Sequence, residues 1–381
     1  MTWRWSRHAD VDGSSGAERE EVWTVRKHRE EGRRYRLTVR YGKSTDLVAL
    51  KRPVVSAFGA HVAQIRESRR RAFAASRLER VASCPICGVS TQQSQPHLTV
   101  YGGTYHQCVS CRHCFIIERP AQGALEEFYA TNTHFAATYT DPTAAQTRVE
   151  QVATPKVEWC LNLFRRLYGR RPARVLDVGA GGGHFVHACR QAGIPADGVE
   201  ASRDARDFAR ATFGIELQAG GLQEAERAAG AQPVELITFW NVLEHVSDPR
   251  RLLRAATSLL RGRRALVVAE TPRWNSLSTA IQAGFRDTVV RHLDPLAHIQ
   301  FFTDSSLATA FVVSGLRPVA AWYFGMDVYE LMTQLSHASG GNGSLAIESL
   351  LRRLETLQRA VDESRGSDGL VLAGRPAQGG R

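Results

Sequence analysis

Residues 174–185 read Arg-Val-Leu-Asp-Val-Gly-Ala-Gly-Gly-Gly-His-Phe: an apolar strand that ends in an acid, a glycine-rich turn and the start of a helix. The backbone of a loop can approach a ligand closely only where the residues lack a Cβ atom. Gly179, Gly181 and Gly183 therefore predict a loop against a small molecule at the carboxyl end of a parallel strand. A dinucleotide-binding loop has glycine at the position of His184, and Asp177 would crowd a diphosphate. The carboxylate favours a cationic ligand instead.

Two later segments also read as strands that end in polar residues. Residues 194–202 form a short strand ending in Glu200, about twenty residues after the glycine loop, which is the spacing of a carboxylate that binds ribose hydroxyls. Dinucleotide and nucleoside-sulfonium enzymes share this feature. Residues 234–249 form a strand that ends at Asn241, followed by the run Val-Leu-Glu-His-Val at 242–246 entering a helix. This third segment distinguishes the two classes.

Together these segments resemble the class I S-adenosylmethionine-dependent methyltransferases, in the branch with a V-L-E-H-V-x-D-P signature after the fourth strand. The resemblance covers roughly residues 155–316. It implies an α/β fold, a Rossmann-like seven-stranded sheet whose last strand is antiparallel, and S-adenosylmethionine as cofactor. The acid and the glycine loop would hold the methionine part, Glu200 the ribose and residues 222–223 the adenine, although many relatives have an acid in place of Gly221. The implied cofactor-binding residues are Asp177, Gly179, Ala180, Gly181, Gly183, Glu200, Ala201, Leu222, Gln223, Asn241 and Leu243.

The same resemblance indicates three candidate catalytic residues. Glu244 and His245 would face the methyl group or the acceptor. His298 begins a run similar to an H-x-x-x-F-T-x-x-S-L run whose histidine lies near the active-site mouth in relatives. Imidazole has a suitable pKa to deprotonate a hydroxyl near neutral pH. The alternatives are structural: an acid in the first turn of a helix complements the helix dipole, and His298 would hydrogen-bond its own loop.

Seven cysteines are present, and five of them fall between positions 84 and 114. Disulfides are rare in cytosolic chains, whereas paired C-x-x-C turns at this spacing are typical of a zinc ribbon. Relatives that place a ribbon before the methyltransferase core read C-x-x-C with a proline shortly after it at the second pair, which resembles residues 111–120. By this similarity we expect Zn²⁺ on Cys84, Cys87, Cys111 and Cys114, with Cys108 or His113 as an alternative ligand.

Further patterns predict how the chain is divided. Residues 22–26 and 35–41 alternate with period two around a glycine and predict a hairpin in a basic N-terminal extension. Helical patterns after the ribbon predict a linker and a lid over the cofactor, and two helices precede the last strand. The expected division is 1–80 for the extension, either partly disordered or a domain, 81–122 for the ribbon, 123–170 for the linker and lid, 171–375 for the methyltransferase core with a helical insertion at 326–365, and 376–381 for a disordered tail.

Composition sets the expected surroundings of the protein. The 381 residues are 43% hydrophobic, which is enough for more than one core, and the formal net charge is +11. Only four of the 49 basic residues are lysines and the arginines are spread along the chain, so we do not expect a nucleic-acid partner. No segment approaches the about eighteen apolar residues of a membrane span. We expect a cytoplasmic protein without a membrane partner, and the oligomeric state is left open.

The function expected from these features is methyl transfer from S-adenosylmethionine to a small polar acceptor, such as a sugar, a nucleotide-sugar or a glycan, at carbon or oxygen. Two alternatives stand beside it. In one, the ribbon and the basic arm bind RNA or a protein, and the methyltransferase core is a scaffold. In the other, RNA is methylated, although the Asn-Pro-Pro-Tyr type of tetrad expected for base-amino methylation is absent at residues 240–243, which read Trp-Asn-Val-Leu.

Overall fold

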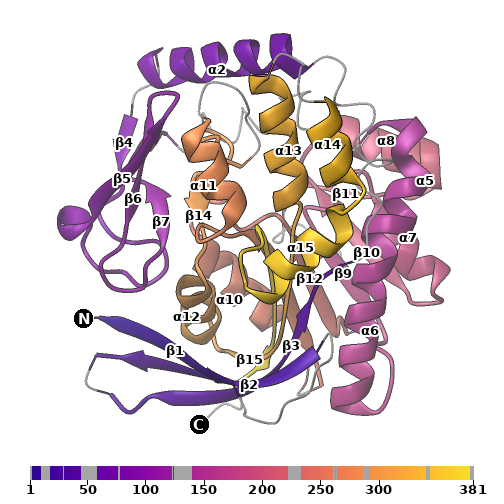
Figure 1. Ribbon diagram of the computed structural model, residues 1–381. Coiled ribbons are helices and arrows are strands. Elements are labelled where there is room, and N and C mark those ends of the chain that lie inside the picture. The colour runs from indigo at the N-terminus through magenta and orange to yellow at the C-terminus, as the bar shows by residue number, and fades with distance from the viewer. Residues whose placement is uncertain are drawn as a thin grey trace.

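The computed structural model shows one large sheet with helices on both faces and a smaller sheet beside it (Figure 1). The ten strands of the large sheet follow the order β1-β2-β3-β15-β16-β13-β12-β9-β10-β11. The structure describes residues 2–9, 18–28, 30–43, 58–75, 78–121, 123, 140–221, 233–260, 262, 264–285, 292–339 and 344–377.

Seven neighbouring strands of this sheet form a Rossmann-like unit. β9 (Val175–Val178), β10 (Ala196–Glu200), β11 (Gln218–Ala219), β12 (Leu236–Trp240) and β13 (Leu266–Pro272) are parallel, and β16 (Gly369–Pro376) runs antiparallel between β13 and β15 (Leu316–Phe324). The predicted α/β fold with an antiparallel last strand is confirmed. Parallel strands end at the same edge of a sheet, so the segments that follow β9, β10, β12 and β13 meet at its carboxyl edge.

The first strands continue this sheet instead of forming a separate extension. β2 (Glu18–Lys27) pairs antiparallel with β1 (Trp3–Ala9) and β3 (Arg33–Tyr41), and β3 pairs in parallel with β15. The predicted hairpin is present, but the expectation that residues 1–80 stand apart from the core is wrong for these strands. The reason is their alternation, which places a set of large apolar side chains, each at most 2% exposed, on the core face: Trp23, Val25, Leu37 and Val39.

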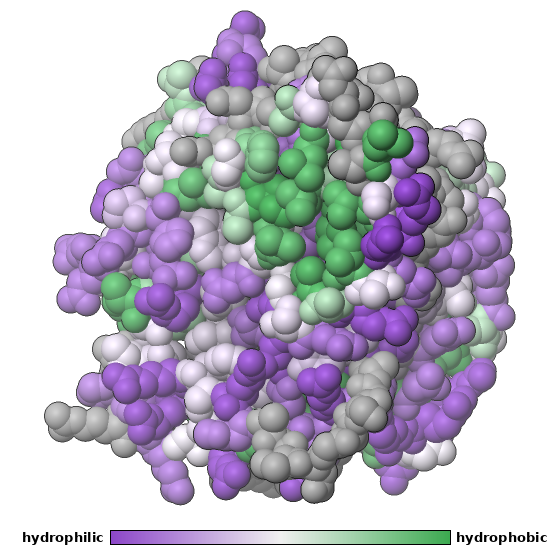
Figure 2. Space-filling view, viewed as in Figure 1, coloured by the Kyte–Doolittle hydropathy of each residue, from purple (hydrophilic) through white to green (hydrophobic). Residues whose placement is uncertain are grey.

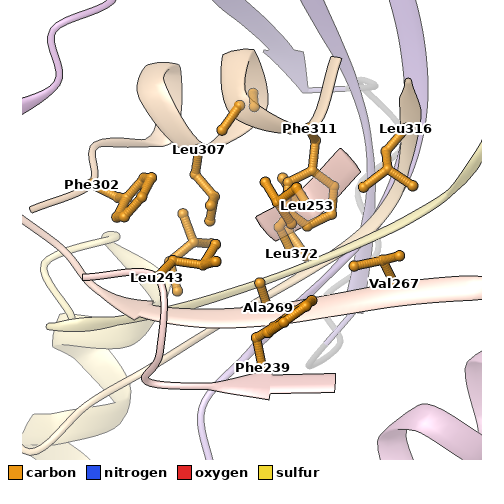
Figure 3. Close-up of a cluster of buried hydrophobic side chains, with 14 of the residues drawn as sticks. Phe239, Leu243, Leu253, Val267, Ala269, Phe302, Leu307, Phe311, Leu316 and Leu372 are labelled. Atoms are coloured by element: carbon orange, nitrogen blue, oxygen red, sulfur yellow. The ribbon is translucent and has the colours of Figure 1, made fainter. Parts of the chain in front are cut away.

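Hydrophobic side chains pack on both faces of the sheet because its central strands are buried on both sides. On one face, Phe239, Leu253 and Phe311 pack between the sheet, α10 (Pro249–Leu259) and α12 (Asp304–Val313), as Figure 3 shows. On the other, Leu236 and Val268 join a core with α6 (Thr154–Tyr168) and α7 (His184–Gln191). α6 buries much of its length here, which fixes it against the sheet.

A small sheet joins the cysteine-rich segment to the core. Its strands are β5 (Gln95–Val100), β6 (Gly103–Gln107), β7 (Cys114–Ile116) and β14 (Gln300–Phe301), and β14 belongs to the core segment. The Tyr105 and Phe301 rings pack edge to face with centroids 5.4 Å apart, and the Tyr105 hydroxyl donates to the His298 carbonyl at 2.8 Å. The cysteine-rich segment therefore lies directly against the loop that carries His298.

Helices α13 (Asp327–Ala338), α14 (Ser344–Leu351) and α15 (Leu354–Glu363) connect β15 to β16 and share a small core with Val328 and Met332. Figure 2 shows apolar side chains gathered on the face over these helices; Leu335 and Leu345 are 40% and 81% exposed.

Among the described residues, no helix has the length and apolar character needed to cross a membrane. The other elements are α2 (Phe58–Ala75), β4 (Leu78–Arg80), η1 (Thr91–Gln93), β8 (Glu118–Pro120), η2 (Pro142–Ala144), α5 (Ala145–Arg148), η3 (Val149–Ala153), α8 (Arg203–Phe213) and α11 (Leu277–Gly284).

Candidate active site

The glycine loop after β9 has a backbone that requires glycine. Gly179, Gly181 and Gly183 have φ angles of 73°, 52° and 77°, in the left-handed region that side chains disfavour. A Cβ at Gly179 would lie 2.6 Å from Cγ2 of Val242. The loop therefore packs closely on the segment that follows β12. Ala180, also predicted to bind the cofactor, is 9% exposed within it.

Two carboxylates flank this loop. Asp177 is 2% exposed and accepts a hydrogen bond from Oγ1 of Thr238 at 2.7 Å. Burial raises the pKa of Asp177 to about 7, although this hydrogen bond and a nearby lysine oppose the rise. Glu200 ends β10 and accepts hydrogen bonds from the backbone N–H groups of Gly181 and Ser202, both at 2.8 Å. Its carboxylate thereby ties the glycine loop to the start of α8.

The remaining predicted cofactor residues have different surroundings. Ala201 is exposed beside Glu200, and Asn241 follows β12 with a φ of 56°. Leu243 is fully buried in the hydrophobic core of Figure 3. Because its side chain packs among the core residues, only its backbone is left for the predicted contact with the cofactor. Leu222 and Gln223, predicted to flank the adenine, lie outside the described residues.

Three charged residues that the sequence reasoning did not single out lie at the same edge. Nζ of Lys156 lies 2.5 Å from Oε2 of Glu270 and 4.5 Å from the ring centroid of Trp240, and both charged side chains are buried. Nδ2 of Asn241 donates to Oε1 of Glu270 at 3.3 Å. Burial and the neighbouring Lys156 charge lower the pKa of Lys43, just after β3, to about 7. One signal was available: Lys43 and Lys156 are two of only four lysines in the chain.

Glu244, His245 and His298 come together after β12. One carboxylate oxygen and one nitrogen of each imidazole all lie within 4.8 Å of one another, and the two ring centroids are 4.9 Å apart. Glu244 is fully buried, and within the described part of the chain neither of its carboxyl oxygens has a hydrogen-bond partner. Burial raises the pKa of Glu244 well above its usual range. Burial therefore favours the protonated form of this carboxyl group, and a nearby cation would favour the ionised form.

Hydrogen bonds to the backbone orient both imidazoles. Nδ1 of His245 lies 2.8 Å from the carbonyl oxygen of Ala297, and Nδ1 of His298 lies 2.7 Å from that of His292. A carbonyl oxygen only accepts, so these two contacts favour the proton at each Nδ1, which leaves the lone pair of a neutral ring at Nε2. Burial lowers the pKa of His245 to about 4, against the effect of the Ala297 carbonyl. The group can accept a proton from a hydroxyl, and its donor set also suits a divalent cation.

Four thiols of the cysteine-rich segment meet at one point. The Sγ atoms of Cys84, Cys87, Cys108 and Cys111 all lie within 4.8 Å of one another. The prediction of Cys114 as the fourth ligand is wrong, and the alternative, Cys108, takes its place. Cys114 begins β7, and its thiol accepts a hydrogen bond from Nε2 of Gln107 at 3.4 Å. The other alternative, His113, is fully buried and bonds Gln300 instead.

Turn geometry explains the choice of Cys108. The N–H of Gly88 donates to the carbonyl of Cys84 at 2.9 Å, and the N–H of Arg112 donates to that of Cys108 at 3.1 Å. The closing residues, Gly88 and Arg112, have left-handed φ angles of 74° and 64°. Each C-x-x-C pair therefore lies in the same kind of turn, and the second turn starts at Cys108.

The chain is similar to known methyltransferases. The family model described as "Methyltransferase domain" matches residues 148–321. A ubiquinone biosynthesis O-methyltransferase of Bordetella avium (strain 197N) is 29% identical over 226 residues, which cover 58% of this chain and 89% of that protein. Its counterpart in Aeromonas salmonicida (strain A449) is 28% identical over 117 residues, or 30% and 48% of the two chains. A solved S-adenosylmethionine-dependent methyltransferase from Archaeoglobus fulgidus has 20% identity and a TM-score of 0.37, covering 57% of this chain and 94% of that one.

The strand order, the glycine loop and the carboxylates after β9 and β10 define the Rossmann-like methyltransferase class. With the matched domain at residues 148–321, they identify the chain as an enzyme that carries an S-adenosylmethionine-dependent methyltransferase domain of class I.

Proposed function

We propose that this methyltransferase transfers the methyl group to an oxygen of a small hydroxylated acceptor, bound where the cysteine-rich segment meets the carboxyl edge of the sheet. The observation that carries this proposal is the meeting of Glu244, His245 and His298 in and around the segment after β12, which packs on the glycine loop through Val242. The relatives named above are O-methyltransferases, which supports oxygen as the acceptor atom. A sugar, nucleotide-sugar or glycan hydroxyl is the acceptor class we favour, and an activated carbon is the alternative.

The residues around the glycine loop fit a sulfonium nucleoside. Gly179, Gly181 and Gly183 leave room for the methionine part, and Asp177 supplies a negative partner for its ammonium group when ionised. Each oxygen of Glu200 already accepts one backbone hydrogen bond and retains a second lone pair for a ribose hydroxyl. Ala180, Ala201 and Asn241 complete the proposed contact surface.

Methyl transfer needs the acceptor oxygen, the methyl carbon and the sulfur in line. The oxygen–carbon bond forms as the carbon–sulfur bond breaks, and the electron pair of that bond leaves with the sulfur. The proton of the acceptor hydroxyl goes to Nε2 of His245 or His298, whose Nδ1 protons are engaged by backbone carbonyls. The Lys156–Glu270 pair and Lys43 supply charged partners for polar groups of the acceptor at the same edge.

We also propose that Cys84, Cys87, Cys108 and Cys111 bind one Zn²⁺ ion. Four thiols at mutual distances within 4.8 Å fit a closed tetrahedral site, which is the arrangement of structural zinc. The ion would stabilise the two C-x-x-C turns and so hold the small sheet, with β7 and β14, against the His298 loop.

The test is transfer of a labelled methyl group from S-adenosylmethionine to fractionated small metabolites, followed by mass spectrometry of the labelled products. We expect a product methylated on oxygen, and loss of that product when His245 and His298 are both replaced by Asn. The single variants His245→Asn and His298→Asn show which imidazole accepts the proton. Label found only on RNA or protein, or full activity in the double variant, would refute the proposal.

A further inference from the structure

A buried ion pair joins α2 to the loop before β14. Nε of Arg69 donates to both carboxylate oxygens of Asp294, at 3.1 and 2.9 Å, and its second terminal nitrogen lies 2.9 Å from Oδ2. The two residues are 225 positions apart in sequence, and they are 5% and 4% exposed. A buried ion pair contributes little net stability after desolvation, so its value to the protein lies in the geometry that it fixes.

Asp294 closes a single turn of backbone. Its Oδ1 accepts hydrogen bonds from the N–H groups of Leu296 and Ala297 at 3.2 and 3.3 Å. Its carbonyl oxygen accepts the N–H of His298 at 2.7 Å. The carboxylate that Arg69 holds therefore sets the conformation of residues 294–298.

This turn and His292, two residues before it, orient the two active-site imidazoles. The carbonyl of Ala297 accepts Nδ1–H of His245, and the carbonyl of His292 accepts Nδ1–H of His298. His245 comes from the segment after β12 and His298 from the turn itself, so the position of the turn determines how the two rings face each other. If the turn shifts, both rings lose the acceptors that select their Nδ1–H tautomer.

We propose that Arg69 is a positioning residue for methyl transfer: through Asp294 it keeps the lone pairs of His245 and His298 at Nε2. The catalytic part of this proposal rests on the proposed function above; the positioning part does not. It also gives α2, which the sequence left without a role, a defined contribution to the active site.

The test compares Arg69→Met with Arg71→Met, using full-length protein with ¹⁵N-labelled histidine. Arg71 lies on the same helix, its side chain is 78% exposed, and it pairs with Glu67, so it controls for loss of a basic residue. Long-range proton–nitrogen NMR spectra, recorded at a pH at which free imidazole is neutral, distinguish the Nδ1–H from the Nε2–H tautomer. We expect Nδ1–H at both rings in the wild type and Arg71→Met, and a mixture of tautomers at both rings in Arg69→Met.

Methyl transfer to the metabolite fraction is measured in parallel, with S-adenosylmethionine affinity by calorimetry. We expect transfer to fall by about tenfold to a hundredfold in Arg69→Met while the affinity changes less than about twofold, because the reacting groups and not the cofactor are misplaced. If Arg69→Met does not fold, Arg69→Lys keeps the charge but not the two-pronged contact, and we expect the same change to a smaller extent. Unchanged tautomers in the folded variant overturn the positioning role. Changed tautomers with full transfer would instead contradict the proposed base.

Discussion

Replacing Glu21 with Gln removes a negative charge from a buried network that joins the N-terminal strands to the methyltransferase sheet. Glu21 is 3% exposed, its Oε2 accepts from Nε1 of Trp23 at 2.9 Å, and its Oε1 accepts from the Tyr41 hydroxyl at 2.8 Å. Its carboxylate also pairs with Arg365, which lies shortly before β16 and donates to the Tyr323 hydroxyl at 2.9 Å. Through these contacts, β2 and β3 are tied to β15 and to the segment that leads into β16.

The expected loss of stability follows from this burial. Burial opposes ionisation of Glu21, but the hydrogen bond and charge of Arg365 and the bonds from Trp23 and Tyr41 outweigh it and hold the pKa of Glu21 below its usual range. Removing one partner of a buried ion pair costs about 3–5 kcal/mol, because the other charge loses its compensation. Arg365 would keep its hydrogen bonds to the hydroxyls of Tyr41 and Tyr323. We therefore expect a loss of unfolding free energy at the lower end of this range, about 3 kcal/mol.

The assay is urea unfolding of Glu21→Gln beside Glu20→Gln. Glu20 is the preceding residue of the same strand, and its exposed carboxylate accepts from Oγ1 of Thr38 at 2.6 Å. We expect the Glu20 variant to stay within about 0.5 kcal/mol of the wild type and the Glu21 variant to lose stability in one cooperative transition. Since the folded pKa of Glu21 is lowered, its contribution is complete above the ordinary glutamate pKa and disappears as pH falls through the folded pKa. Equal losses in both variants, or separate melting of the N-terminal strands, would refute the reasoning.

Two other predictions concern metal binding and pH. Cys108→Ser is expected to reduce bound zinc from about one ion per chain to well below that, whereas Cys114→Ser should retain the ion, because of these two residues only Cys108 belongs to the thiol cluster. Metal analysis of the purified variants checks this. The reverse result would restore Cys114 as the fourth ligand. Asp362→Asn is expected to stabilise the protein increasingly as pH rises between about 4 and 8. Burial raises the pKa of Asp362 to about 8, so the folded protein retains a proton that the unfolded chain releases in this range, and the wild type loses stability. Melting temperatures measured across the range check this, and a difference that does not vary with pH would contradict it.

The sheet and the glycine loop could be predicted because their signals are local. Strands such as β9 and β13 are mostly apolar and are buried along their whole length, as expected for parallel strands that are covered on both faces. The positive φ angles of Gly179, Gly181 and Gly183 depend on the absence of a side chain, which is visible in the sequence itself.

The misplaced residues depend on contacts that the sequence does not display. Leu243 stands next to the Glu244–His245 pair, but the turn after β12 points it into the core. Three cysteines at equal spacing offer two overlapping pairs, and the choice of Cys108 follows from a turn that Arg112 closes in the left-handed conformation, for which the sequence provides no glycine.

Tertiary pairing also placed residues that local patterns could not. The sequence predicts a hairpin near the N-terminus but not that β3 pairs with β15, since that pairing joins strands almost 300 residues apart, as in Ala320 opposite Thr38. For the same reason, Lys156 pairs with Glu270, and Lys43 lies close enough for both charges to affect its pKa. Each comes from a different part of the chain, and only the fold brings them to one edge.

The most direct test of the account is calorimetric titration of S-adenosylmethionine into the wild type, Gly181→Arg and Gly193→Arg. Both glycines have left-handed φ angles, 52° and 75°, but Gly193 precedes β10, away from the cofactor edge, with open space around its Cβ position. The account predicts binding by the wild type and Gly193→Arg, and no binding by folded Gly181→Arg. Unaltered binding by Gly181→Arg would contradict the assignment of the glycine loop to the methyl donor.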